Sequence, residues 1–194
     1  MKTEIGLTTA FVIGLIFKFS HLPGGNMLIV ISMGAMAMLY FPLAFYFFSD
    51  KNIKTQNLAL SIISGLLLST VPLALLFKLL YWPGATVYSY TSVIGSIISI
   101  ITVLALRKGS ADNLKNYYKN MLTRTSILTA VSLIFLFILT TKTLVFLQYG
   151  QDPELARLKY QHFTNPDNQQ YADELETYEI TKAVEPVTDK NTNP

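Results

Sequence analysis

The chain has 194 residues, of which 51% are hydrophobic and only 14% are charged, against about a quarter charged in soluble proteins. It has no cysteine and only two histidines, which excludes disulfides, thiolate catalysis and cysteine-based zinc sites. The formal charge of +3 comes from basic residues in short segments between apolar runs, a pattern that favours insertion into a membrane over binding of nucleic acid.

The first predicted element is an uncleaved apolar helix over residues 5–22. Pro23 and Gly24 end this helix, and an uncharged run over residues 27–48 follows the turn. A run of this length can cross a bilayer as a helix. We therefore expect residues 1–49 to form a first transmembrane hairpin.

A second hairpin is predicted over residues 58–106, with apolar runs at 58–80 and 85–106 on either side of a second Pro-Gly turn. Its turn repeats the first one at an offset of sixty residues. The shared positions are Phe17, Lys18, Pro23 and Gly24 in the first copy and Phe77, Lys78, Pro83 and Gly84 in the second. Self-similarity at a fixed spacing indicates an internal duplication.

A basic linker is predicted over residues 107–126, in which apolar residues recur at helical spacing. We expect a cytoplasmic segment that forms a short helix on an anionic lipid surface. A fifth apolar run over residues 127–148 predicts a fifth transmembrane helix. The predicted fold is thus all-α, a polytopic membrane protein with two repeated hairpins and a fifth spanning helix.

The segment 149–194 differs in composition, with nine acidic and four basic residues. Asp152 and Asn165 each precede a proline, a pattern typical of a capping residue followed by the first helical position. We expect two short helices on an extracytoplasmic, acidic tail, with disorder from Glu185 onward.

The basic residues also predict the orientation. With the N-terminus in the cytoplasm, the lysines and arginines before residue 125, apart from Lys18 and Lys78, all face inward, and both Pro-Gly turns and the tail face outward. We therefore expect a multi-pass protein of the cytoplasmic (inner) membrane with a periplasmic C-terminal tail.

Lys18 and Lys78 each lie five positions before a turn proline, near the outer end of an apolar helix. In one interpretation their ammonium groups snorkel to lipid headgroups or bind turn carbonyls. In the other they form an intramembrane ion pair or a proton-linked site. No aspartate or glutamate occurs within the five predicted spans, so a carboxylate partner would have to come from another subunit.

His21 and Trp82 occupy the positions just before the turns, where aromatic rings commonly lie at the membrane interface. His21 could alternatively bind a metal, but the sequence offers no second ligand beside it. We predict no metal and no other cofactor.

Small residues recur in both apolar runs of the second hairpin at intervals that bring them to one face of each helix. They are Ser61, Gly65 and Ser69 in the first run and Ser92 and Ser96 in the second. Such residues allow close packing of transmembrane helices. The alternative interpretation is a polar pathway for a solute.

The two motifs, with Phe-Lys followed after a short interval by His or Trp and then Pro-Gly, resemble the membrane domain of GldL, a gliding-motility and type IX secretion protein of Bacteroidetes. The resemblance covers residues 5–106. The first copy keeps His21 and the second keeps Trp82, each with half of the family's His-Trp pair. The resemblance implies an inner-membrane subunit that oligomerises around partner helices and converts proton flow into motion.

The family's motor function is tied to an acidic residue shortly after a glycine in the second helix of the hairpin. Neither Gly34 nor Gly95 is followed by such a residue here. We therefore expect a GldL-like structural or accessory subunit that is not an enzyme, with lipid and either further copies or other membrane subunits as partners. A small transporter or channel that uses the lysines and the serine face is the alternative.

Overall fold

The computed structural model describes residues 2–48, 58–108 and 114–184, and these residues form helices and no strand. The chain divides into two compact units, Met1–Thr140 and Thr141–Pro194. The predicted all-α fold is therefore observed in the described residues. The polar loop at 49–57 and the end of the tail from Glu185, predicted to be disordered, lie outside them.

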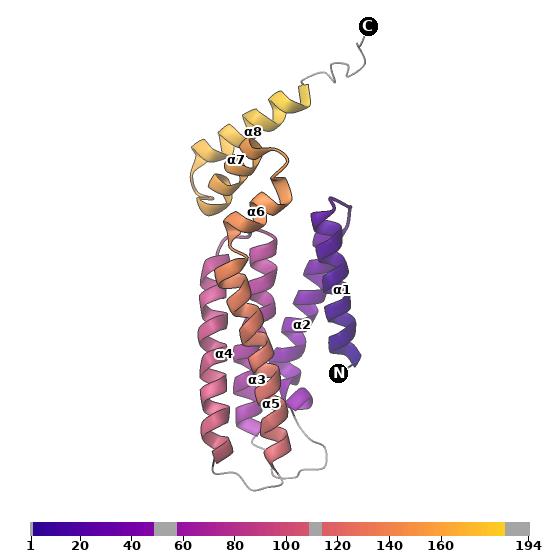
Figure 1. Cartoon of the computed structure of the whole chain (residues 1–194), viewed down its shortest axis with the longest axis vertical. Helices are drawn as coiled ribbons and strands as arrows, with labels where there is room; N and C mark the ends of the chain where they lie inside the picture. The colour runs from indigo at the N-terminus through magenta and orange to yellow at the C-terminus, as the bar shows by residue number, and fades with distance from the viewer. Residues whose placement is uncertain (1, 49–57, 109–113, 185–194) are drawn as a thin grey trace. The chain divides into compact units, whose positions relative to one another are not determined.

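The described residues of the first unit form five α-helices and one π-helix in series. They are α1 (Lys2–Phe19), α2 (Gly25–Phe48), α3 (Leu58–Leu79), α4 (Ala85–Lys108), α5 (Lys115–Leu133) and η2 (Ile134–Ile138). Each helix packs against the next one in the chain, and α3, α4 and α5 lie side by side (Figure 1).

Three helical segments in the described part of the chain are long and apolar enough to cross a membrane: Ala59–Leu79, Ala85–Lys108 and Lys115–Ile138. Their length and composition indicate a membrane protein. The apolar segment Gly25–Phe41 is shorter.

The fifth helix does not have the predicted boundaries. The prediction placed a separate interfacial helix in the linker 107–126 and a span over residues 127–148. In the structure one helix begins at Lys115, continues through η2 and ends at Ile138, and α6 begins after a break at Leu139 and Thr140.

The reason lies in how the charged residues are placed on this helix. Tyr117, Met121 and Thr125 are buried in a stripe at four-residue spacing, while Lys115 and Lys119 are exposed on other faces. The packed face of the helix therefore runs through the segment that its charges had suggested was a linker.

The second unit contains α6 (Thr141–Tyr149), α7 (Pro153–Thr164) and α8 (Gln169–Val184). The Asp152 cap of α7 is confirmed, because its carboxylate accepts a hydrogen bond from the Leu155 N–H at 3.1 Å. The second predicted cap is wrong. Helix α8 begins at Gln169, and the side chain of Asn168, not Asn165, accepts from the Gln170 N–H at 3.0 Å.

Candidate functional site

The turns that end α1 and α3 have the same backbone conformation. His21 and Tyr81 both have φ of 57°, the left-handed conformation that non-glycine residues rarely adopt. After them, the Leu22 N–H donates to the Phe17 carbonyl at 2.8 Å. In the second turn, the Trp82 N–H donates to the Phe77 carbonyl at 2.9 Å. This bond across five residues is the Schellman ending of a helix, which satisfies carbonyls at its C-terminus.

Each turn then passes through proline and a glycine with positive φ, 89° at Gly24 and 87° at Gly84. A glycine reaches this conformation without the steric cost that a side chain would impose. The carbonyl of each glycine accepts the first hydrogen bond of the following helix, at 3.0 Å from Leu28 and 3.1 Å from Tyr88. The two turns thus position their lysines identically on the preceding helices.

Lys18 is 7% exposed, and its Nζ donates to the Asn26 Oδ1 at 3.0 Å. The same ammonium group lies 5.1 Å from the centroid of the Tyr81 ring, within the range of a cation–π interaction. Lys18 in α1 therefore contacts both α2, the other helix of its own hairpin, and Tyr81, the left-handed residue of the second turn.

Lys78 is 6% exposed and donates to the backbone carbonyl of Phe135 in η2. In an α-helix that carbonyl would accept from the Leu139 N–H. Here the Leu139 N–H bonds the Ile134 carbonyl at 2.9 Å, as a π-helix requires. Lys78 thus supplies the donor that the helix ending takes away from Phe135.

Both lysines have neutral partners in the described residues, and no ion pair joins either of them to a carboxylate there. The prediction gave lipid headgroups or turn carbonyls as their partners, whereas the observed partners are the Asn26 side chain and a backbone carbonyl in η2. Lys142, a third lysine in an apolar stretch, is exposed on α6.

The second turn carries an aromatic cluster that the first turn lacks. Phe77 contacts Trp82 edge to face at a centroid distance of 5.3 Å and lies 4.5 Å from the Tyr88 ring. Leucines occupy the places of Trp82 and Tyr88 in the first turn. His21 is exposed, and the described residues hold no group of three His, Cys, Asp or Glu side chains that could bind a metal.

The small residues predicted to mediate packing are all buried between helices: Ser61, Gly65, Ser69, Ser92 and Ser96. The Ser61 hydroxyl bonds the hydroxyl of Tyr117 and so connects α3 to α5. The other three serine hydroxyls donate to carbonyls of their own helices. A Cβ at Gly95 would lie 3.5 Å from Leu67, so α3 and α4 are in close contact there.

Two other buried serine hydroxyls, those of Ser99 on α4 and Ser132 on α5, have no hydrogen-bond partner among the described residues. The residues are 1% and 4% exposed. Buried polar atoms are normally bonded to protein or to water, so a water molecule is the expected partner of each of these hydroxyls.

The sequence reasoning missed one polar cluster entirely. The Tyr40 hydroxyl donates to Glu4 at 3.0 Å, and Arg124 lies 3.6 Å from the other carboxylate oxygen. Glu4 precedes the predicted helix over residues 5–22, and Arg124 lies in the predicted linker over residues 107–126. Helix register could have found half of the cluster, because Glu4 and Tyr40 are equally distant from the turn, as Lys18 and Asn26 are.

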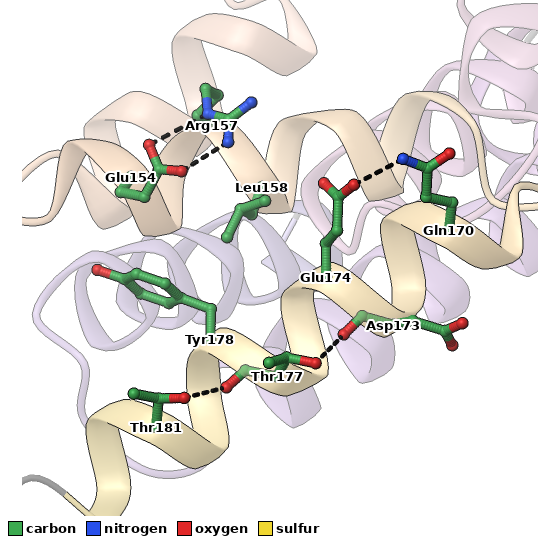
Figure 2. Close-up of a pocket in the computed structure, with 9 residues that line it drawn as sticks. All are labelled: Glu154, Arg157, Leu158, Gln170, Asp173, Glu174, Thr177, Tyr178 and Thr181. Carbon is green, nitrogen blue, oxygen red and sulfur yellow. Dashed lines mark hydrogen bonds and ion pairs between the residues drawn. The ribbon is translucent and has the colours of Figure 1, made fainter.

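In the second unit, a groove of about 740 Å³ lies between α7 and α8. Figure 2 shows Leu158 and Tyr178 between the two helices, with Glu154 paired to Arg157 on one wall and Glu174 to Gln170 on the other. Each of these pairs lies within a single helix. The groove between the helices is shallow and partly acidic.

Asp152 connects α7 to α8, near the start of α7. It accepts hydrogen bonds from Tyr178 at 3.0 Å and from Lys182, and the hydrogen bond from Lys182 lowers the pKa of the Asp152 carboxyl. The carboxylate therefore caps α7 and holds α8 against it.

Comparison with protein families, with characterised proteins and with solved structures finds no match to this chain. In the part of the chain that the structure describes, the fold is all-α and three helices are long and apolar enough to cross a membrane.

Proposed function

We propose that this protein is an integral protein of the cytoplasmic membrane, built from two repeated helical hairpins, that serves as a non-enzymatic structural or accessory subunit of an envelope complex. Its N-terminus faces the cytoplasm and its acidic tail faces the other side. The positions of the basic residues support this orientation.

One observation carries the proposal. Both buried ammonium groups, on Lys18 and Lys78, are used to hold helix ends together through Asn26, Tyr81 and the Phe135 carbonyl. A transport site needs a charged group that faces a pathway and can exchange partners. A subunit whose role is to present a fixed set of helices needs its buried charges satisfied in place, as these are.

The resemblance to GldL supports the envelope setting, because both turns keep the Phe-Lys and Pro-Gly positions. The missing carboxylates after Gly34 and Gly95 argue against proton-driven motor activity by this chain alone. Glu4 does not replace them, since it lies in α1 and is engaged by Tyr40 and Arg124. Lipid and other membrane subunits, or further copies of the chain, are the expected partners.

Reconstitution into liposomes tests the proposal. Vesicles that carry the purified protein should lose an imposed pH gradient or a chloride gradient no faster than empty vesicles. A leak that rises with protein density, and that Lys18→Leu abolishes, contradicts a purely structural role. Chemical cross-linking in native membranes, followed by mass spectrometry, should recover stable partner subunits.

A small channel or transporter is the second candidate. The buried hydroxyls of Ser99 and Ser132, which have no partner among the described residues, favour it, because each site could bind water or a polar group of a solute. If these serines line a path, Ser99→Ala should lower the flux of a small neutral solute such as glycerol. If they only pack helices, the variant has no effect on flux.

A further inference from the structure

The end of the fifth membrane helix repeats the sequence of the hairpin motif. Leu133-Ile134-Phe135-Leu136-Phe137 matches Leu15-Ile16-Phe17-Lys18-Phe19 at four of five positions, and the one difference replaces the lysine with Leu136. We infer that α5 with η2 is a third, lysine-free copy of the hairpin's first helix, and that it closes the row of hairpins by occupying the surface of the second hairpin that another hairpin would take.

Burial supports the alignment of the three copies. The residue four positions before the lysine position is small and buried in each: Gly14, Ala74 and Ser132. The phenylalanine just before the lysine position is partly buried in all three. The third copy therefore presents the same face to its neighbours as the first two.

Packing gives the stronger argument. The first hairpin contacts the second mainly through α2 against α3, and the second contacts the third copy mainly through α4 against α5, which also touches α2 and α3. Lys18 of α1 reaches the end of α3 at Tyr81, and Lys78 of α3 reaches the end of η2 at Phe135. In both cases the lysine of one copy contacts the end of the first helix of the next copy, through the Tyr81 ring in the first case and through the Phe135 carbonyl in the second.

A contact of this kind is heterologous, because a donor on one unit meets an acceptor on a different surface of the next. Heterologous contacts continue into rings or filaments unless a last unit lacks one of the two surfaces. The third copy is contacted by the lysine of the second at its Phe135 carbonyl but has no lysine of its own, since Leu136 stands at the lysine position. Its outer end also bears exposed apolar side chains, with Phe137 71% and Ile138 64% exposed, as suits contact with lipid.

The partner that fits the lysine surface of the second hairpin is therefore a hairpin of the same type, and α5 excludes it. This inference depends on the membrane hairpins of the proposed function. It adds that Lys78 already has a partner within the chain, the Phe135 carbonyl, so we expect that copies of this protein do not join one another through that surface.

Site-specific photocross-linking of the full-length protein in native membranes tests the inference. With p-benzoylphenylalanine in place of Phe135, peptide mapping should find cross-links to residues 75–82 of the same chain. Co-expression of two copies with different tags distinguishes links within a chain from links between chains. The same probe at Phe137, which is exposed, is the matched control and should not link to residues 75–82.

Restoring the lysine provides the second arm. Leu136→Lys should create an unpaired donor that recruits another copy. Native mass spectrometry should therefore show an assembly with more copies for this variant than for the wild type. Ile138→Lys adds the same charge off the repeat position and should leave the mass unchanged. Cross-links from position 135 only between chains, or a folded Leu136→Lys protein with unchanged mass, would overturn the inference.

The two proposals can fail separately. Intrachain cross-links together with protein-dependent ion flux would retain the third copy and reject the structural role. Interchain cross-links without flux would reject closure of the row and retain the structural role. If Leu136→Lys does not fold, the cross-linking arm still decides the inference.

Discussion

Removing each of the two buried lysines should have different consequences, although the sequence places them in equivalent positions. Lys78→Met removes the donor to the Phe135 carbonyl and leaves that carbonyl without its helical partner. A fully buried acceptor without a donor costs about 1–3 kcal/mol, and the part-buried Phe135 carbonyl should cost about 1–2 kcal/mol. Methionine keeps the length of the side chain, so little of the effect should come from a cavity.

Lys18→Met should cost less, because its partner Asn26 is exposed and can bond water or headgroups instead. Loss of the contact with the Tyr81 ring should contribute about 0.5–1 kcal/mol. We therefore expect Lys78→Met to be the more destabilising substitution by about 1 kcal/mol, or about 2–4 °C in melting temperature for a chain of this size.

The chain offers a direct assay for the second turn. Trp82 is the only tryptophan and stacks edge to face on Phe77, so its fluorescence during thermal unfolding in detergent reports this turn alone. Lys142→Met, at an exposed position in the other unit, is the control and should melt as the wild type does. A Lys78→Met protein as stable as wild type, or a larger loss for Lys18→Met, would refute the assignment of these contacts.

Three further predictions concern other parts of the chain. Gly25→Ala should lower the melting temperature, because its Cβ would lie 2.6 Å from a backbone nitrogen of α1, whereas Gly34→Ala, with nothing within 4 Å, should be neutral or stabilising by up to about 1 kcal/mol. The hydrogen bond from Lys182 lowers the pKa of Asp152 in the folded protein. The contact between α7 and α8 should therefore be fully present above the unfolded pKa of an aspartate, about 3.9, and be lost as the pH falls through the lower folded pKa. Amide exchange in α8 should show this loss, and Asp152→Asn should abolish the pH dependence. Glu4→Gln should lower the melting temperature by removing the ion pair to α5, and unchanged melting would show that this pair contributes nothing to the bundle.

Local signals in the sequence predicted what local chemistry determines. Proline and glycine placed both turns, and Asp152 before a proline placed the start of α7. The all-α class followed from the apolar runs. These features depend on residues close to one another in the chain, which is why a sequence pattern can reveal them.

The features that escaped prediction depend on contacts between distant segments. The helix formed by α5 and η2 ends at Leu139 and Thr140 without a proline or glycine, and the contact of Lys78 with Phe135 joins residues 57 positions apart. The ion pair between Glu4 and Arg124 was missed for the same reason, since each was assigned to a segment by its own neighbours. The sequence identified the two lysines but not their partners.

The membrane topology of the two hairpins is the central claim, and labelling of single cysteines tests it most directly. The protein has no native cysteine, so each introduced thiol reports one position. In intact cells an impermeant maleimide should label Asn26→Cys and Ala85→Cys at the turns, and Thr55→Cys in the loop between hairpins only after permeabilisation. Labelling of Thr55→Cys in intact cells, with the turn positions protected, would contradict the proposed orientation and the account built on it.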